Sequence, residues 1–279
     1  HIWYPEAEVA GLNSKTGYEV MNMNLGAMHN TPGDVGSYGL LYQWGRKDPF
    51  PAAPTLTGTT ATVGAPIYDG DDNEIKITNS SQSSTADNNL AFAIANPTVC
   101  LSNYAQFNTS RDWLQADMSN DALWGNPKGA ERNETNDFLN KGAKSFYDPC
   151  PVGWRVPPAD VFRNFTASGG YAWVIDDFDI ADISGDGAKS LADYDYGWTF
   201  NLSDSASSYF PAAARFDGSY AMLMGSMSGL WGSYWGNAPY PGDMFQGGAY
   251  SVLSFQIKDT AGNEMITTSP AGGGARADA

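Results

Sequence analysis

The fold class follows from one stretch near the end of the 279-residue chain, Ala249-Tyr250-Ser251-Val252-Leu253-Ser254-Phe255-Gln256-Ile257. Successive residues alternate between two faces, and Leu253, Phe255 and Ile257 share one of them. A period of two is typical of a β-strand that buries one face, because neighbouring side chains point to opposite sides of a sheet. The stretch therefore predicts a long strand.

Shorter stretches of the same kind lie on the N-terminal side of this strand, at 197–201, 208–212 and 232–236. They are separated by Gly, Ser and Pro, which favour turns. We therefore expect an antiparallel meander after residue 196.

The first part of the chain is less regular. Strands are expected at 18–20 and 21–27, and a hairpin is expected between 65–68 and 75–78. The Asp- and Gly-rich turn between the two halves of the hairpin favours this pairing. Much of 51–146 is expected to lack regular structure.

Two short segments have helical features. Residues 39–46 fit about two helical turns that end at Gly45, and residues 159–165 follow Pro158, which suits the start of a helix. No internal repeat or change of composition divides the chain. The sequence thus predicts a single α+β domain over 1–279, with short antiparallel sheets, two helices and long irregular loops.

Composition excludes several classes of protein. Hydrophobic residues make up 42%, enough for a sizeable core. The formal net charge is −16, which disfavours binding to nucleic acid or to anionic membranes, although solubility alone could explain it. No apolar run approaches the ~20 residues of a membrane span, so direct membrane insertion is not expected.

Few groups suited to catalysis stand out. Only two histidines are present, which leaves little material for a histidine acid–base centre or a zinc site. Phosphate-binding loops and nucleophile elbows are missing from the sequence. Carboxylates are abundant, so a glycosidase-type pair stays open as an alternative.

Residues 182–193 have the spacing of a calcium loop, with oxygen-bearing residues at positions 1, 3, 5, 9 and 12 and Gly187 at the sharp turn. Lys189 and the short side chain at position 12 depart from the usual pattern. The alternative is an acidic surface loop in which Asp and Gly form turns. The candidate Ca²⁺ ligands are Asp182, Ser184, Asp186, the carbonyl of Ala188, Ser190 and Asp193.

Residues 228–250 are rich in aromatic side chains set among Gly, Ser, Asn and Asp, a composition typical of recognition surfaces. Such residues bind glycans or proteins, and the alternative is that many of them are core. For Trp235, on an expected strand, we favour the core. The candidate ligand-binding residues are Trp231, Ser233, Tyr234, Asn237, Tyr240, Asp243 and Phe245.

Five motifs together resemble the Fibrobacter succinogenes major paralogous domain family, which is widespread in surface proteins of the Bacteroidetes. They occur in the family's order across 24–255, nearly the whole chain. The motifs are Asn24-Leu25-Gly26-Ala27, the run from Gly39 to Phe50, the run from Tyr147 to Pro157, Tyr209-Phe210-Pro211-Ala212-Ala213, and Tyr234-Trp235.

The resemblance implies a C-type-lectin-like fold and an exported protein, often a surface lipoprotein or a fimbrial tip adhesin. In some relatives a retroelement diversifies the late aromatic segment. The related formylglycine-generating enzymes use cysteines late in the chain, and none follows Cys150 here. Catalysis by that route is therefore not expected.

The chain also departs from the family. Asn22-Met23 replaces an Asp-Arg pair, Gly236-Asn237 replaces a Ser-Ser pair, and 174–196 has the features of an insertion. The family's closing strand would follow Ala279, and the usual partner of Cys150 would lie in it. Cys150 is then either paired with Cys100 or free, and we expect it not to be a reactive thiol.

These expectations combine into one hypothesis, a non-enzymatic adhesin or ligand-binding domain outside the cell, on the outer-membrane surface or a pilus tip. Its partner would be a glycan or a host or bacterial surface protein, with other pilus or surface-complex subunits as further partners. Two alternatives remain: a carbohydrate-active enzyme with a carboxylate pair, and a structural pilus or surface-complex subunit.

Overall fold

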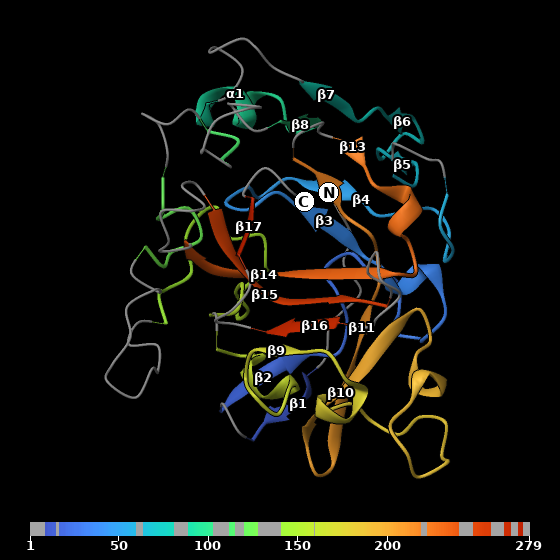
Figure 1. The fold of residues 1–279 in the computed structure, drawn as a ribbon. Helices are drawn as coiled ribbons and strands as arrows, with labels where there is room; N and C mark the ends of the chain where they lie inside the picture. The colour runs from blue at the N-terminus through green and yellow to red at the C-terminus, as the bar shows by residue number, and fades with distance from the viewer. Residues whose placement is uncertain are drawn as a thin grey trace.

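The computed structural model describes residues 9–14, 17–59, 64–80, 89–102, 112–114, 120–127, 141–158, 160–218, 222–239, 248–257, 265–268 and 273–275. Its largest element is a five-stranded antiparallel sheet across the middle of Figure 1. The strands run in the order β14 (Trp231–Pro239), β15 (Gly248–Gln256), β16 (Met265–Thr268) and β9 (Tyr171–Ala172), and β17 (Gly273–Ala275) also pairs with β15. The predicted strand at 249–257 is thus confirmed as the centre of the sheet.

The other strands described form two-stranded sheets around this one (Figure 1), and all of these are antiparallel except β7–β8. The pairs are β1 (Val9–Asn13) with β2 (Tyr18–Met21), β3 (Leu40–Tyr42) with β4 (Pro49–Pro51), β5 (Ile67–Tyr68) with β6 (Glu74–Ile75), β7 (Thr78–Ser80) with β8 (Val99–Leu101), β10 (Gly197–Ser203) with β11 (Ala206–Pro211), and β12 (Phe216–Asp217) with β13 (Met222–Leu223).

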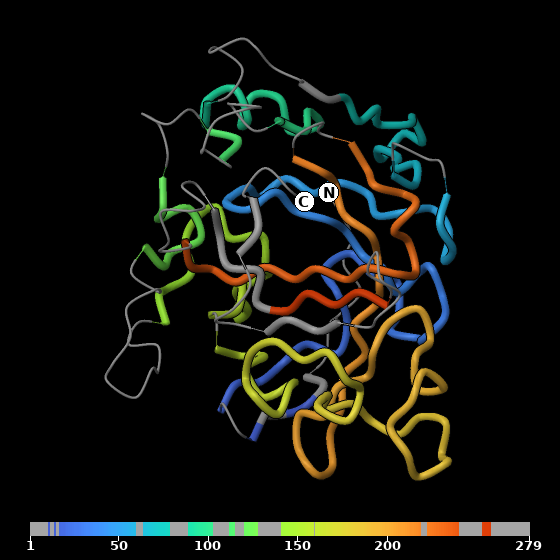
Figure 2. The backbone as a smooth tube through the Cα atoms, viewed as in Figure 1, coloured from blue at the N-terminus to red at the C-terminus, as the bar shows by residue number. Residues whose placement is uncertain are grey.

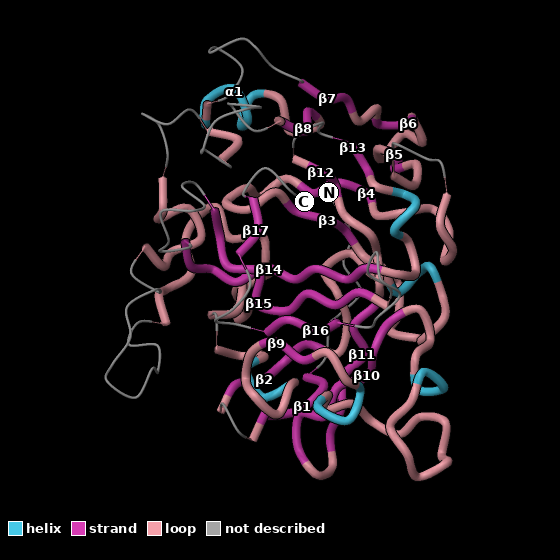
Figure 3. Tube along the Cα trace, in the orientation of Figure 1, coloured by secondary structure: helices cyan, strands magenta, loops and turns pink. Residues whose placement is uncertain are grey.

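Helix is scarce in the described part of the chain (Figure 3). The one α-helix there is α1 (Leu90–Ala95), which the sequence analysis did not predict; the side chain of Asn89 caps it by accepting the Phe92 N–H at 2.7 Å. Single 3₁₀ turns make up the rest: η1 (Val35–Ser37), η2 (Arg163–Phe165), η3 (Ile175–Asp177), η4 (Leu191–Asp193) and η5 (Gly225–Met227). The protein is a β-rich, mixed fold with many loops.

The helix predicted at 39–46 is wrong, because residues 40–42 form strand β3. Leu40 and Tyr42 pack in one hydrophobic cluster, whereas Leu41 packs in another. Alternating burial on two sides requires an extended backbone, and it outweighs the local helical pattern. Gly39 and Gly45 both have positive φ, which interrupts a helix at both ends of the segment.

The expectations at 159–165 and 21–27 also need correction. Hydrogen bonds from Val161 to Pro158 and from Phe165 to Phe162 join residues three apart, so this segment forms successive tight turns that end in η2 instead of an α-helix. The strand expected at 21–27 does not form: β2 ends at Met21, and a hydrogen bond from the Ala27 N–H to the carbonyl of Asn24 at 3.0 Å closes a turn in which Gly26 has φ +77°.

The hairpin predicted around residues 69–73 is confirmed as β5–β6. The Asp69 carboxylate accepts the N–H groups of Asp71 and Asn73, both at 2.9 Å, and closes the turn. The strands predicted near 18–20, 197–201, 208–212 and 232–236 are confirmed within β2, β10, β11 and β14.

The core has three clusters. The sheet cluster packs β10, β11 and β15 around a stacked pair, Phe165 and Phe200, whose ring centroids are 4.3 Å apart. The tryptophan cluster is built on Trp44, Trp113 and Trp124, each at most 1% exposed. A third cluster forms around Phe50 and Phe216.

None of the helices in the described ranges combines the length and the apolar character that crossing a membrane requires.

Candidate functional site

A cavity of about 390 Å³ is lined by residues from all three core clusters. Its volume falls in the range of small-ligand sites, and its lining is mostly apolar and aromatic, as such sites usually are. The described lining comes from five parts of the chain and one further tryptophan: 18–25, 38–42, 149–162, 208–214, 233–235 and Trp124.

Indole hydrogen bonds hold the wall on the side of the tryptophan cluster. Trp235 Nε1 donates to the carbonyl of Tyr42 at 2.9 Å, and Trp44 Nε1 donates to the carbonyl of Gly236 at 2.9 Å. Strand β14 is thereby fixed to β3 and the residues after it. Because buried indoles need an acceptor for their one N–H, these contacts also define the register of the two segments.

Arg46 closes the tryptophan cluster behind this wall. Its guanidinium is buried and donates to Gln43 Oε1 at 3.0 Å and to the carbonyl of Val99 at 2.6 Å. It also lies 5.2 Å from the ring centroid of Phe50. Burial lowers the pKa of Arg46, with Asp48 acting in the opposite direction, but an arginine stays charged at neutral pH. Arg46 therefore acts in the fold, away from the cavity surface.

A second wall is the proline-rich segment 149–158, which Asp148 holds at both ends. The buried Asp148 carboxylate accepts the N–H of Cys150 and the N–H of Val156, each at 2.9 Å, and pairs with Lys144 Nζ at 2.9 Å. The turn between them places Gly153 and Trp154 on the cavity.

Two tyrosines of the lining, Tyr209 and Tyr234, donate their hydroxyl groups to backbone carbonyls. Tyr209 donates to the carbonyl of Asp195 at 2.7 Å, and Tyr234 donates to the carbonyl of Pro211 at 2.8 Å. Burial, reinforced by neighbouring phenols, raises the pKa of Tyr194, Tyr209 and Tyr234. These hydroxyls stay protonated at physiological pH, so they act as hydrogen-bond donors within the fold.

The structure divides the predicted ligand-binding residues. Ser233 and Tyr234 line the cavity, as does the neighbouring Trp235, which packs against the tryptophan cluster as expected for a core residue. Trp231 is half-buried outside the described lining: its Nε1 donates to Ser254 Oγ at 3.0 Å, and the Arg215 guanidinium lies 4.3 Å from its ring centroid.

Asn237 is buried at 1% exposure, with its side chain between two loops. It accepts a hydrogen bond from Asn126 Nδ2 at 2.9 Å and donates to the carbonyl of Lys141 at 3.2 Å. The side chain therefore ties loops to β14. Tyr240, Asp243 and Phe245 lie outside the described residues, and ligand contact by the predicted set stays a prediction.

The predicted calcium loop, 182–193, forms an excursion beside β10 (Figure 2). Its carboxylates accept hydrogen bonds from the loop's own backbone. Asp182 accepts the N–H groups of Gly185 at 2.6 Å and Gly187 at 2.9 Å, and Asp186 accepts that of Ala188 at 2.8 Å.

Asp193 is buried and accepts the N–H groups of Ser184 and Ser190, each at 3.0 Å, and with Ser190 it forms a capping box on η4. Burial alone would raise the pKa of Asp193, but these hydrogen bonds outweigh it and lower that pKa. Among the residues with described positions, no three His, Cys, Asp or Glu side chains gather as a metal would require. Calcium binding here remains a sequence-based prediction.

Cys100 and Cys150 are not joined by a disulfide in the structure. Cys150 is half-buried on the cavity wall. Burial, together with the nearby Asp148 carboxylate, raises the pKa of its thiol. A protonated thiol is a poor nucleophile, in agreement with the expectation that Cys150 is unreactive.

The sequence analysis did not identify three residues that line the cavity: Glu19, Trp154 and Arg155. A signal existed for Trp154 alone. A Pro-x-Gly-Trp turn between rigid proline segments presents its tryptophan at the surface, and Gly153, with φ +88°, is where that turn needs a glycine.

Comparisons of the chain with protein-family models, with curated proteins and with solved structures find no match.

Proposed function

We propose that the chain is a non-enzymatic ligand-binding domain of the cell-surface or fimbrial-tip adhesin type, which binds a glycan or a protein through aromatic side chains. One observation carries the proposal: the 390 Å³ cavity, whose walls are mostly apolar and aromatic with a few polar groups. Such a cavity provides apolar contact area, and the polar groups provide orientation. An extracellular location at the outer surface goes with this proposal.

We also propose the family relationship and the C-type-lectin-like fold. Their support is spatial. Residues from all five motifs line the same cavity, although the motifs are spread over positions 24–235. Distant segments that share a wall are expected when a motif set encodes one structural centre, and unrelated chance matches would be scattered.

The carbohydrate-active enzyme is less well supported. Glycosidases of the usual kind need two carboxyl groups on opposite sides of the scissile bond. In the described lining Glu19 is the one carboxylate, and it is exposed at the cavity wall. The geometry therefore favours binding over hydrolysis.

The second candidate function is that of a structural pilus subunit, in which part of the predicted binding surface serves the fold. The side-chain N–H groups of Asn237 and Trp235 donate to carbonyls elsewhere in the fold. If the whole of 228–250 behaves in this way, the segment is scaffold and not a contact surface.

The direct test is to screen the purified chain on an array of oligosaccharides and on an array of purified extracellular-matrix and serum proteins. We expect saturable binding to at least one class. Trp231→Ala and Tyr240→Ala then test the predicted surface: a loss of affinity of ~2 kcal/mol or more at unchanged stability indicates contact, and a loss of stability alone indicates scaffold. Turnover of aryl glycosides would contradict a non-enzymatic role.

A further inference from the structure

We infer that the cavity is a saccharide site in which a neutral sugar ring stacks on Trp154 while its hydroxyl groups bond to Glu19 and Arg155. This inference rests on the proposed function and deepens it, because it selects one ligand class and one place on the protein. Three features of the cavity carry it: a rigid aromatic platform, polar groups with free donors and acceptors in the same lining, and a balance of charge.

The platform is Trp154. Its backbone N–H closes a turn on the carbonyl of Pro151 at 3.1 Å, and Asp148 fixes the residues on both sides of that turn. The side chain is half-buried, so one part of the ring is supported and another is open. A preorganised aromatic ring loses little conformational entropy on binding.

The indole N–H of Trp154 differs from those of the other two tryptophans in the lining. Trp124 Nε1 donates to the carbonyls of Arg46 and Tyr147 at 3.2 and 3.1 Å, and Trp235 Nε1 donates to Tyr42. Trp154 Nε1 has no hydrogen-bond partner within the part of the chain that the structure describes. It is therefore available to a ligand acceptor.

Arg155 is held on one side only. Its Nη1 donates to the carbonyls of Gly142 at 2.6 Å and Lys141 at 3.2 Å, which orients the guanidinium plane. Of the five guanidinium donors, those on Nη2 and Nε have no partner among the described residues. An oriented guanidinium with free donors can bind two neighbouring oxygens at once.

Glu19 supplies the complementary acceptor. It lies on β2, and its side chain is exposed at the cavity wall without a hydrogen-bond or ion-pair partner in the described ranges. A carboxylate accepts from two hydroxyl groups at once, as a vicinal diol offers. The cavity thus has donors on one segment and an acceptor on another.

These groups together select the chemical class. A sugar ring has a face of C–H bonds, whose partial positive charge suits the negative face of an aromatic ring, and hydroxyls that both donate and accept. A purely apolar ligand would leave Glu19 and Arg155 without partners as it displaced their water, which is costly. A phosphorylated or sulfated ligand would meet the Glu19 carboxylate and a chain of net charge −16.

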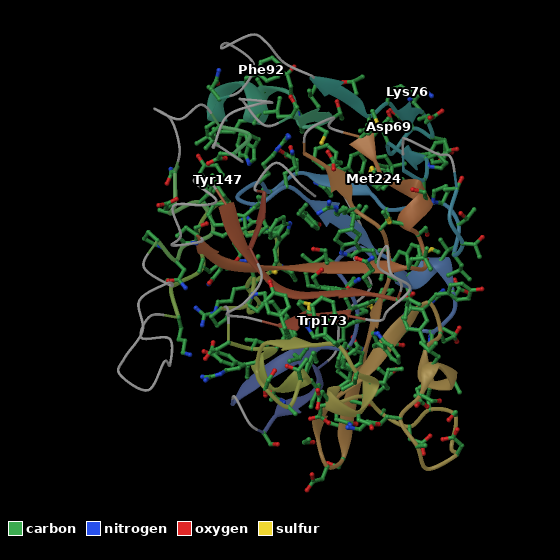
Figure 4. All side chains as sticks on the ribbon, viewed as in Figure 1. Asp69, Lys76, Phe92, Tyr147, Trp173 and Met224 are labelled. Atoms are coloured by element: carbon green, nitrogen blue, oxygen red, sulfur yellow. The ribbon has the colours of Figure 1, made fainter. Side chains whose placement is uncertain are left out.

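The test begins with an array of neutral, sialylated and sulfated oligosaccharides, run beside the protein array described above. Calorimetry with the best-bound neutral oligosaccharide then compares wild type with Trp154→Ala, Trp154→Phe and Glu19→Gln. The matched controls are Trp173→Ala and Glu74→Gln. Trp173 is 54% exposed, directly after β9 (Figure 4), and Glu74 lies on the β5–β6 hairpin; neither is in the described lining.

We expect neutral oligosaccharides to bind, Trp154→Ala and Glu19→Gln to weaken binding by about tenfold or more, and the controls to match wild type. Trp154→Phe keeps an aromatic ring and loses the indole N–H, so its affinity for the oligosaccharide should lie between those of wild type and Trp154→Ala. This variant also keeps the test decisive if the alanine variant unfolds. Glycan binding that survives Trp154→Ala and Glu19→Gln would overturn the inference and leave the proposed function standing. Binding to proteins alone would do the same, and binding to neither array would overturn both.

Discussion

Replacing Asp148 with alanine should destabilise the protein strongly, because its carboxylate is buried at 1% exposure and is fully used. It accepts two backbone N–H groups, from Cys150 and Val156, and one ammonium, from Lys144. Alanine leaves both N–H groups without an acceptor inside the fold, whereas the exposed Lys144 ammonium is solvated by water.

The magnitude follows from these contacts. A hydrogen bond to a charged group contributes about 1.5–3 kcal/mol, so two of them contribute ~3–6 kcal/mol. Removing the carboxylate also removes the cost of burying its charge, which offsets part of this sum. We expect the free energy of unfolding to fall by about 3–4 kcal/mol, a large share of the ~5–15 kcal/mol typical of a domain.

Urea unfolding at pH 7, followed by tryptophan fluorescence and circular dichroism, measures the change. Asp69→Ala is the matched control, because the Asp69 carboxylate also accepts two backbone N–H groups but in a fully exposed turn. Water replaces its bonds, so its loss should be small. If Asp148→Ala and Asp69→Ala unfold at the same urea concentration, the buried hydrogen bonds of Asp148 do not contribute more to stability than the exposed ones of Asp69, and the prediction is wrong.

Four further predictions follow from the structure and sequence. Burial raises the pKa of Tyr194, Tyr209 and Tyr234, so the folded chain keeps protons that the unfolded chain loses above pH ~10. The free energy of unfolding should then fall by about 1.4 kcal/mol per pH unit for each of these tyrosines. In an alkaline titration, unfolding should coincide with the rise of tyrosinate absorbance. Unchanged stability up to pH ~11.5 would contradict this. Gly125→Ala should cost more than Gly185→Ala in urea unfolding: both have positive φ, but a Cβ at Gly125 would overlap the carbonyl oxygen of Ala143, whereas one at Gly185 meets nothing. If 182–193 binds Ca²⁺ at the ~10⁻⁴–10⁻³ M level, several millimolar Ca²⁺ should raise the melting temperature in a chelator-sensitive way, and Asp186→Ala should lose the rise; no shift in wild type counts against the site. Cys100 and Cys150 should both react slowly with a thiol reagent at pH 8 in the native protein and should give two thiols per chain after unfolding; fast alkylation of native Cys150 would be the contrary result.

The parts of the fold that the sequence predicts are those with a local cause. Strand β15 has unbroken alternation, and the β5–β6 turn has an aspartate that closes it. The helix predicted at 39–46 was wrong because distant residues, and not the local sequence, determine the structure of that segment. Its backbone is set by which cluster receives Leu41 and which receives Tyr42, and those clusters are built by residues far away in the chain.

The same distinction applies to the candidate site. Composition marked 228–250 as aromatic, but composition does not tell a tryptophan whose N–H is bonded from one whose N–H is free. Trp235 lies in an aromatic stretch and Trp154 in a proline-rich one, and both line the cavity, yet only the structure shows that the indole N–H of Trp235 is bonded to the carbonyl of Tyr42. Glu19 lies 135 positions before Trp154 in the sequence (154 − 19), so no local pattern could join them.

The polar groups around the cavity are therefore of two kinds, those whose hydrogen bonds are made within the protein and those that keep free donors or acceptors. One kind makes its hydrogen bonds inside the protein: Asp148, Asn237 and the indoles of Trp124 and Trp235. Removing any of these side chains leaves its buried partner without a hydrogen bond. Trp154, Arg155 and Glu19 keep free groups at the surface of the same walls. Substitutions at the first kind should change stability and, through it, binding, whereas substitutions at the second kind should change binding with little effect on stability. A surface built in this way can vary its recognition residues while the bonds that hold its walls stay intact.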